Sequence, residues 1–214
     1  MDQATLLDRT RWGMNIAART IGAVTDLYRP RGGLRPLSPS HRILRLHAAF
    51  TPRRGGLLAT NVYGDPLLHG IFDAAYTRAG DFLVQPDRTM FIASQAGLVQ
   101  PLCVLTNRTV TIARAMLPGA VGSSAYGGFT EGSAAVLLED WPASVLGVSD
   151  AGHPTAGLPG DISIPFWTVL MPAWADIVVR PGDLFTDDLG RSAVIAAAEH
   201  SEMGWRLTVK QVST

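Results

Sequence analysis

From Leu57 onward the chain is a series of short apolar segments separated by Gly, Pro and Asp, and this pattern limits its fold most strongly. In the clearest segment, apolar and polar side chains alternate at successive positions: Trp205, Arg206, Leu207, Thr208, Val209 and Lys210. An alternation of period two is typical of a β-strand with one buried face. The pattern predicts a mainly β protein made of small barrel or sandwich modules.

Turn residues divide this β region into hairpins. Asp81–Val84 and Thr89–Ala93 flank a turn with Pro and Asp at its centre, which are residue types that suit the two central turn positions. Leu102–Leu105 and Thr109–Ala113 predict a second hairpin around Thr106-Asn107-Arg108. Near the end of the chain, three runs predict a meander: Leu184–Thr186, Ser192–Ala197 and Trp205–Val209.

One turn motif occurs twice. Arg78–Leu83 and Arg180–Phe185 both read Arg-x-Gly-Asp followed by two apolar residues. The Gly permits a tight bend, and the Asp can bond the local backbone before the strand begins. We interpret the echo as turn chemistry shared by two β-modules, and a duplication would also produce it.

The N-terminal region has a different pattern. Apolar residues recur every seven positions at Leu7, Met14, Ile21 and Tyr28, which predicts a helix over residues 3–28. Pro30 disfavours helix in the residue before it and so ends this helix.

The residues after Pro30 are rich in Pro and Gly as far as Gly56 and contain one strand-like run, Ile43–Leu46. A long segment with little regular structure is usually a binding arm or a linker wrapped on a partner. We therefore predict four segments: a helix and extended arm over 1–56, a first β-module over 57–117, a Gly/Ser-rich flexible loop over 118–135, and a C-terminal barrel-like module over 136–214.

The zero net charge of the chain hides an internal asymmetry. Residues 1–54 hold ten Arg against three Asp, and the remaining 160 residues carry the balancing excess of acidic groups. Such asymmetry predicts that the arm meets an acidic partner, or that it lies on the acidic body of its own chain. Seventeen of the 18 Lys and Arg residues are Arg. The planar guanidinium of Arg suits fixed interface contacts, although GC-rich coding would also produce an excess of Arg over Lys. The candidate docking residues are Arg29, Arg31, Arg35, Arg42, Arg45, Arg53 and Arg54.

No pattern in the sequence points to catalysis. Gly122–Tyr126 has Tyr where a nucleophile elbow needs Gly, and Cys103 lies among apolar residues as a buried thiol would. Asp150–His153 could hold a metal only with ligands from elsewhere. We therefore predict a protein that is not an enzyme and has no cofactor or metal. The uncharged stretches Ala115–Thr130 and Ile162–Ala175 contain Gly or Pro and are shorter than the roughly 20 residues of a membrane-spanning helix.

A cluster of large side chains surrounds the second uncharged stretch: Trp141, Phe166, Trp167, Met171 and Trp174. Aromatic residues and Met between prolines suit either a barrel core or an interface.

The C-terminal pattern also carries a resemblance. Ile177–Arg191, Val194–Glu199 and Gly204–Val209 resemble the closing β-meander of the head-closure and adaptor proteins in the neck of tailed bacteriophages. The middle region is similar to proteins encoded in phage structural-gene clusters, in the segments Gly80–Val84, Phe91–Gln95 and Pro101–Arg108. The long N-terminal helix, the arm and the extra β-module depart from the minimal neck protein.

The resemblance implies a virion subunit that is made in the bacterial host cytoplasm and assembles as a homo-oligomeric ring. Its partners would be portal, neck or tail subunits, with DNA passing nearby, and no catalytic residue is carried over. The first alternative is a DNA-contacting module that grips phosphates with the same Arg set. The second is a β-rich cell-wall or carbohydrate-active tail enzyme, which would need a cleft with paired carboxylates.

Overall fold

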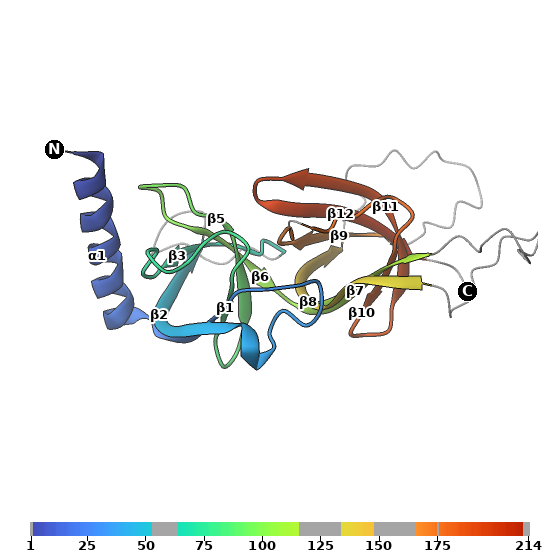
Figure 1. Ribbon diagram of the computed structural model, residues 1–214, viewed down its shortest axis with the longest axis horizontal. Coiled ribbons are helices and arrows are strands. Elements are labelled where there is room, and N and C mark those ends of the chain that lie inside the picture. Colours follow the sequence, from blue (N-terminus) through green and yellow to red (C-terminus); the bar gives the residue numbers. More distant parts are fainter. Residues whose placement is uncertain (1, 53–63, 116–133, 148–165, 175, 212–214) are drawn as a thin grey trace, which may run out of the picture.

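A computed structural model of the chain describes residues 2–52, 64–115, 134–147, 166–174 and 176–211. These residues form one helix and two closed antiparallel barrels, which follow one another along the long axis of the molecule (Figure 1). The prediction of a mainly β protein with small barrel modules and an N-terminal helix is therefore confirmed.

The helix α1 (Gln3–Ile21) lies beside the first barrel at one end of the molecule (Figure 1). The first barrel consists of β1 (Ala23–Tyr28), β2 (Arg42–Pro52), β3 (Leu67–Ile71), β4 (Phe82–Val84), β5 (Thr89–Ser94) and β6 (Leu102–Thr106), with a short 3-10 helix at Pro39–His41 before β2. The second consists of β7 (Arg108–Ala115), β8 (Ala134–Gly147), β9 (Phe166–Met171), β10 (Leu184–Asp187), β11 (Ser192–Ser201) and β12 (Gly204–Gln211).

The two barrels have the same topology. Around the first barrel the strand order is β1-β2-β3-β6-β5-β4, and around the second it is β7-β8-β9-β12-β11-β10. Each strand of one barrel thus has a counterpart in the other at the same place in the chain order. The barrels are tandem copies of one topology, and the repeated turn motif lies at equivalent positions in them, just before β4 and β10.

The repeated turns are also alike in geometry. Gly80 and Gly182 have φ angles of +89° and +93°, where an L side chain is strained. Their N–H groups donate to the carbonyls of Ile92 and Ile195, both at 2.8 Å. The predicted turn chemistry is present in both barrels.

Replacing a glycine at positive φ and a glycine within α1 tests the geometry of the repeated turn. Gly182→Ala is expected to lower the free energy of unfolding by about 1–2 kcal/mol, because a side chain at positive φ meets its own backbone while no neighbouring atom lies within 4 Å of the added Cβ. The control is Gly13→Ala on the exposed side of α1, which is expected to raise helix stability by about 1 kcal/mol. Urea unfolding followed by circular dichroism measures both, and equal signs for the two variants would contradict this assignment.

One apolar core continues from barrel to barrel. Phe82 of β4 and Trp141 of β8 are both 0% exposed, and their rings meet edge to face with centroids 5.8 Å apart. The ring of Trp174 also packs edge to face with Trp141, with centroids 6.5 Å apart. Met171, from the same aromatic cluster, is also buried in this core, whereas Trp167 is half-buried and lies under the guanidinium of Arg191.

The predicted helix over residues 3–28 is seven residues too long. The chain leaves α1 at Gly22, where an added Cβ would collide with Ala18 O and the backbone of Ala48, so only glycine permits this close crossing. The β-branched and aromatic residues that follow pair as β1 with β2. Tyr28 thus belongs to a strand, and its seven-residue spacing from Ile21 is a coincidence.

The predicted arm is more regular than its composition suggests. Arg42–Pro52 forms an eleven-residue strand, β2, that pairs with β1 and β3. Leu44 and Leu46 are half-buried and Ala48 is buried, whereas Arg45 and His47 are exposed. The period-two pattern of a strand was therefore present in this part of the Arg-rich arm. The N-terminal segment therefore supplies two strands of the first barrel, and among the described residues of the arm the extended part is residues 29–38.

The predicted hairpin around Asn107 is wrong. β6 pairs with β3 and β5, while β7 pairs with β8 and β10, so the two runs belong to different barrels. The side-chain amide of Asn107 makes two hydrogen bonds to the backbone of Val145 in β8, as a neighbouring strand would. Its amide donates to Val145 O at 2.9 Å, and its Oδ1 accepts from Val145 N at 2.8 Å. This pairing directs the chain into the second barrel.

The barrels divide the chain differently from the predicted segments. The first spans residues 23–106 and the second 108–211, so residues 23–52 and 108–115 each lie in a different unit from the one predicted. Most of the predicted loop over 118–135 lies outside the described residues, and its last two positions begin β8.

The C-terminal meander is confirmed. β10, β11 and β12 pair in sequence, with Trp205, Leu207 and Val209 buried and Arg206 and Lys210 exposed. In the described part of the chain no helix has the length and apolar character needed to cross a membrane.

Candidate functional site

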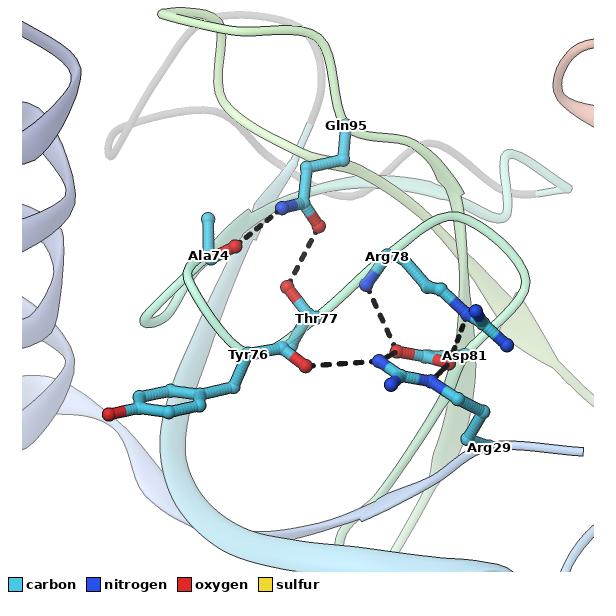
Figure 2. A network of polar contacts seen from close by, with 7 residues as sticks. All are labelled: Arg29, Ala74, Tyr76, Thr77, Arg78, Asp81 and Gln95. Atoms are coloured by element: carbon cyan, nitrogen blue, oxygen red, sulfur yellow. Dashed lines mark hydrogen bonds and ion pairs between the residues drawn. The ribbon is translucent and has the colours of Figure 1, made fainter. Parts of the chain in front are cut away.

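The predicted docking residues have several partners within the chain. Arg29 follows β1 and binds Asp81, which is buried: Nε and Nη2 donate to the two carboxylate oxygens at 2.8 and 2.7 Å. Figure 2 shows that Asp81 also accepts from the backbone N–H of Arg78, while Arg29 donates to Tyr76 O. The same figure shows Gln95 joining Thr77 to Ala74 in this loop. Arg29 thus holds the turn before β4.

The second barrel contains the same clamp. Arg114 of β7 donates from Nε and Nη2 to Asp183, both at 2.8 Å, and from Nη2 to Val178 O. The backbone N–H of Arg180 also donates to Asp183. Bidentate pairing of an Arg with a buried carboxylate is geometrically specific and stronger than a neutral hydrogen bond. Hence Arg29 and Arg114 are equivalent structural residues of the two barrels.

A further buried carboxylate is bound by Arg in the β10–β11 turn. Burial acts to raise the pKa of Asp187, but hydrogen bonds from the side chain and backbone of Arg191 outweigh it, and the net pKa is lowered. Asp187 is thereby kept ionised as a turn residue.

The short extended part of the arm lies on the second barrel. Arg35 binds Glu139 through its side chain at 2.9 Å and through its backbone N–H, and Asp140 lies 3.5 Å from Arg35 Nε. The indole N–H of Trp141 donates to Gly33 O at 2.6 Å. At Arg35, the arm therefore contacts acidic residues of its own chain. This is the second alternative given above for the charge asymmetry, that the arm lies on the acidic body of the same chain.

Arg42 and Arg45 share Asp26 as a partner across the β1–β2 pair, both at 2.8 Å. The hydrogen bond from Arg45 is the main cause that lowers the pKa of Asp26. Arg31 is exposed and makes no hydrogen bond or ion pair with the described residues. Arg53 and Arg54 lie outside the described residues. The docking role of the whole Arg set stays a prediction.

Sequence reasoning missed an exposed apolar stripe on α1. Trp12 and Ile16 are 68% and 46% exposed, and their spacing of four places them on one face of the helix. Of the residues of α1, only Ala18 is buried. Arg9 and Arg19 lie on the same stripe, one turn before Trp12 and one turn after Ile16. The stripe is visible in the sequence, but the seven-residue repeat of the opposite face obscured it.

A cleft of about 900 Å³ lies between the two barrels. The first barrel lines it with apolar side chains that include Leu67, Phe91 and Leu102, and the second with Leu170 and Trp205. Two exposed apolar residues at its walls face solvent, Val99 (67%) from the loop after β5 and Met203 (54%) from the β11–β12 turn.

The cleft has few polar groups. Glu199 and Arg206 lie at its wall as an exposed pair 3.9 Å apart. His69 also lines it, and its buried Nδ1 finds no hydrogen-bond partner among the described residues. Large apolar clefts with a few polar groups are the usual form of binding sites.

The one cysteine is chemically protected. Cys103 is buried in the first barrel, and desolvation raises the pKa of its thiol to about 12. Since the thiolate is the reactive form, we expect no labelling of native protein by a maleimide at pH 7 over hours, and complete labelling in 6 M guanidinium. Rapid labelling of the folded protein, followed by mass spectrometry, would contradict this environment. The sequence-based prediction of a buried thiol is confirmed.

The remaining chemical candidates can be placed only in part. Gly122–Tyr126 and Asp150–His153 lie outside the described residues. Within the described ranges, no group of three or more His, Cys, Asp or Glu is arranged to hold a metal ion.

Comparison with protein-family models, curated proteins and solved structures finds no match for this chain. Its functional assignment therefore depends on the surfaces described above, above all on the α1 stripe and the cleft.

Proposed function

We propose that this chain is a structural subunit of a tailed-bacteriophage virion, in which copies assemble as a ring at the head–tail junction or in the tail. The observation that carries the proposal is the exposed Trp12–Ile16 stripe on α1. Exposed apolar groups that include a Trp are typical of protein interfaces, where Trp contributes binding energy out of proportion to its number.

The closed barrels favour association through such a surface. In each barrel the strand order closes on itself, which leaves less free sheet edge than an open sheet has. Among the described residues, Arg42–Ala48 of β2 and Ala197–Ser201 of β11 are still paired on one side only. Closed rings are a common outcome when side-chain surfaces such as the α1 stripe make head-to-tail contacts between copies.

The two alternatives have less support. A DNA-contacting module needs free cations, and Arg29, Arg35, Arg42 and Arg45 each bind a carboxylate of their own chain. An enzyme needs a carboxylate pair in a cleft. The most buried carboxylates in the described residues, Asp81, Asp183 and Asp187, are each bound by an Arg instead.

The proposal is tested in the bacterial strain that carries the gene. We expect mass spectrometry of purified DNA-filled particles to detect this chain, and we expect deletion of the gene to abolish complete particles. Complementation with Trp12→Ala/Ile16→Ala should fail, whereas Ile21→Ala, which removes an exposed side chain on the opposite side of α1 from Trp12, should restore particles. Absence of the chain from particles, together with normal particles from the deletion strain, would reject the function.

A further inference from the structure

We propose that the cleft between the two barrels receives Trp12 and Ile16 from α1 of a second copy of this chain. The inference rests on the proposed function, because it names the contact through which the subunits of a ring would join. Its starting point is that one chain displays both an unburied apolar projection and a wide apolar cleft.

The projection is held in a fixed direction. A different face of α1 contacts the first barrel, where Ala18 is buried and Asn15 Nδ2 donates to Asp73 Oδ2 at 2.9 Å. Trp12 and Ile16 therefore point away from their own barrel, and Figure 1 shows α1 standing at the end of the molecule. Because Trp12 remains 68% exposed, the cleft of its own chain does not hold it.

The cleft suits these side chains in size and chemistry. A volume of about 900 Å³ is in the range that holds a drug-sized ligand, so an indole and a branched aliphatic chain can enter together. Leu67, Leu102 and Leu170 line the cleft, are partly exposed and offer aliphatic surface for these side chains. Val99 and Met203 would be covered when a helix lies over the opening.

The charges at the two surfaces are complementary. Arg9 and Arg19 lie at either end of the apolar pair on α1, whereas Glu199 lines the cleft and Glu202 adjoins Met203 in the β11–β12 turn. Among the described residues that line the cleft, Arg206 is the one Arg or Lys that offsets these acidic groups. Opposite charges around an apolar centre steer association and fix its register.

Such a contact joins two different surfaces, so a pair of copies keeps one free helix on one copy and one free cleft on the other. A heterologous contact of this kind generates a closed ring or an open chain rather than a two-fold dimer. It is therefore a contact that can build the ring of the proposed function.

Cross-linking between full-length chains tests the geometry. Chains carrying Ile16→Cys are mixed with epitope-tagged chains carrying Met203→Cys and treated with a short bis-maleimide, and the native Cys103 is too buried to react. We expect a mixed dimer to form in high yield. The matched control replaces Ile16→Cys by Ile21→Cys, which lies about half a turn from Trp12 around the helix. Equal yields for both mixtures would overturn the proposal.

Sedimentation of the unmodified chain supplies a second measurement. We expect concentration-dependent association that Trp12→Ala/Ile16→Ala weakens by about 30-fold or more, the fold-change of an interface hot spot, while Ile21→Ala leaves it unchanged. A wild-type chain that stays monomeric at high concentration, or association that the double variant does not affect, would reject the contact.

The two proposals fail separately. If the chain is present in particles but the cross-link is absent, the docking contact is wrong and the virion function stands. If the cross-link forms but the chain is absent from particles, the virion function is wrong.

Discussion

We expect Trp141→Ala to lower the free energy of unfolding by about 3–5 kcal/mol, which is the usual cost of removing a buried Trp. Trp141 is 0% exposed, packs against both Phe82 and Trp174, and donates its indole N–H to Gly33 O. The truncation opens a cavity at the joint of the two barrels and removes one of the two hydrogen bonds that Gly33 O accepts, while the bond from Glu139 N remains. Urea unfolding followed by near-ultraviolet circular dichroism measures the change.

The matched control is the same substitution at Trp12. Because Trp12 is mostly exposed, Trp12→Ala is expected to change the unfolding free energy by less than about 0.5 kcal/mol, as for other surface substitutions. The two tryptophans thus separate the two roles: loss at Trp141 affects folding, and loss at Trp12 affects association. A small effect at Trp141 would show that the barrels do not depend on a shared core.

The second large effect is expected at the paired clamps. Asp81→Asn and Asp183→Asn keep side-chain volume but remove the charge that binds Arg29 and Arg114. Breaking a buried ion pair costs about 3–5 kcal/mol. Here the Arg side chains are 26% and 33% exposed, so water offsets part of the loss and we expect about 2–4 kcal/mol for each variant.

The control for the clamps is Asp87→Asn in the β4–β5 turn, whose side chain is 71% exposed beside Arg88. A surface pair of this kind is worth about 0–1 kcal/mol. Since the two clamps lie in separate barrels and share no partner, their losses should add in Asp81→Asn/Asp183→Asn. A difference of more than a factor of three between Asp81→Asn and Asp183→Asn would contradict the equivalence of the two turns.

The candidate site was only partly predictable. The sequence directed attention to Arg residues of the arm, because charge asymmetry is visible without a fold. Four of these find carboxylate partners that are remote in the sequence or across a strand pair, and no spacing rule reveals such pairs. The cleft was missed because the approach of Leu67 to Trp205 depends on how the barrels pack. The spacing of Trp12 and Ile16 is visible in the sequence, but their exposure is known only from the packing of α1.

Local chemistry in the sequence determined the β-class, the last meander and the two Arg-x-Gly-Asp turns, since alternation and turn propensity act over a few residues. Contacts between residues far apart in the sequence determined where α1 ends and where the first barrel passes into the second. At Gly22 a close crossing over Ala48 converted the end of a helical repeat into a strand, and at Asn107 an amide bonded to Val145 turned an expected hairpin into the junction of two barrels. Tertiary structure also revealed that the two barrels share one topology, because equal strand order is a property of contacts between segments that are far apart in the chain.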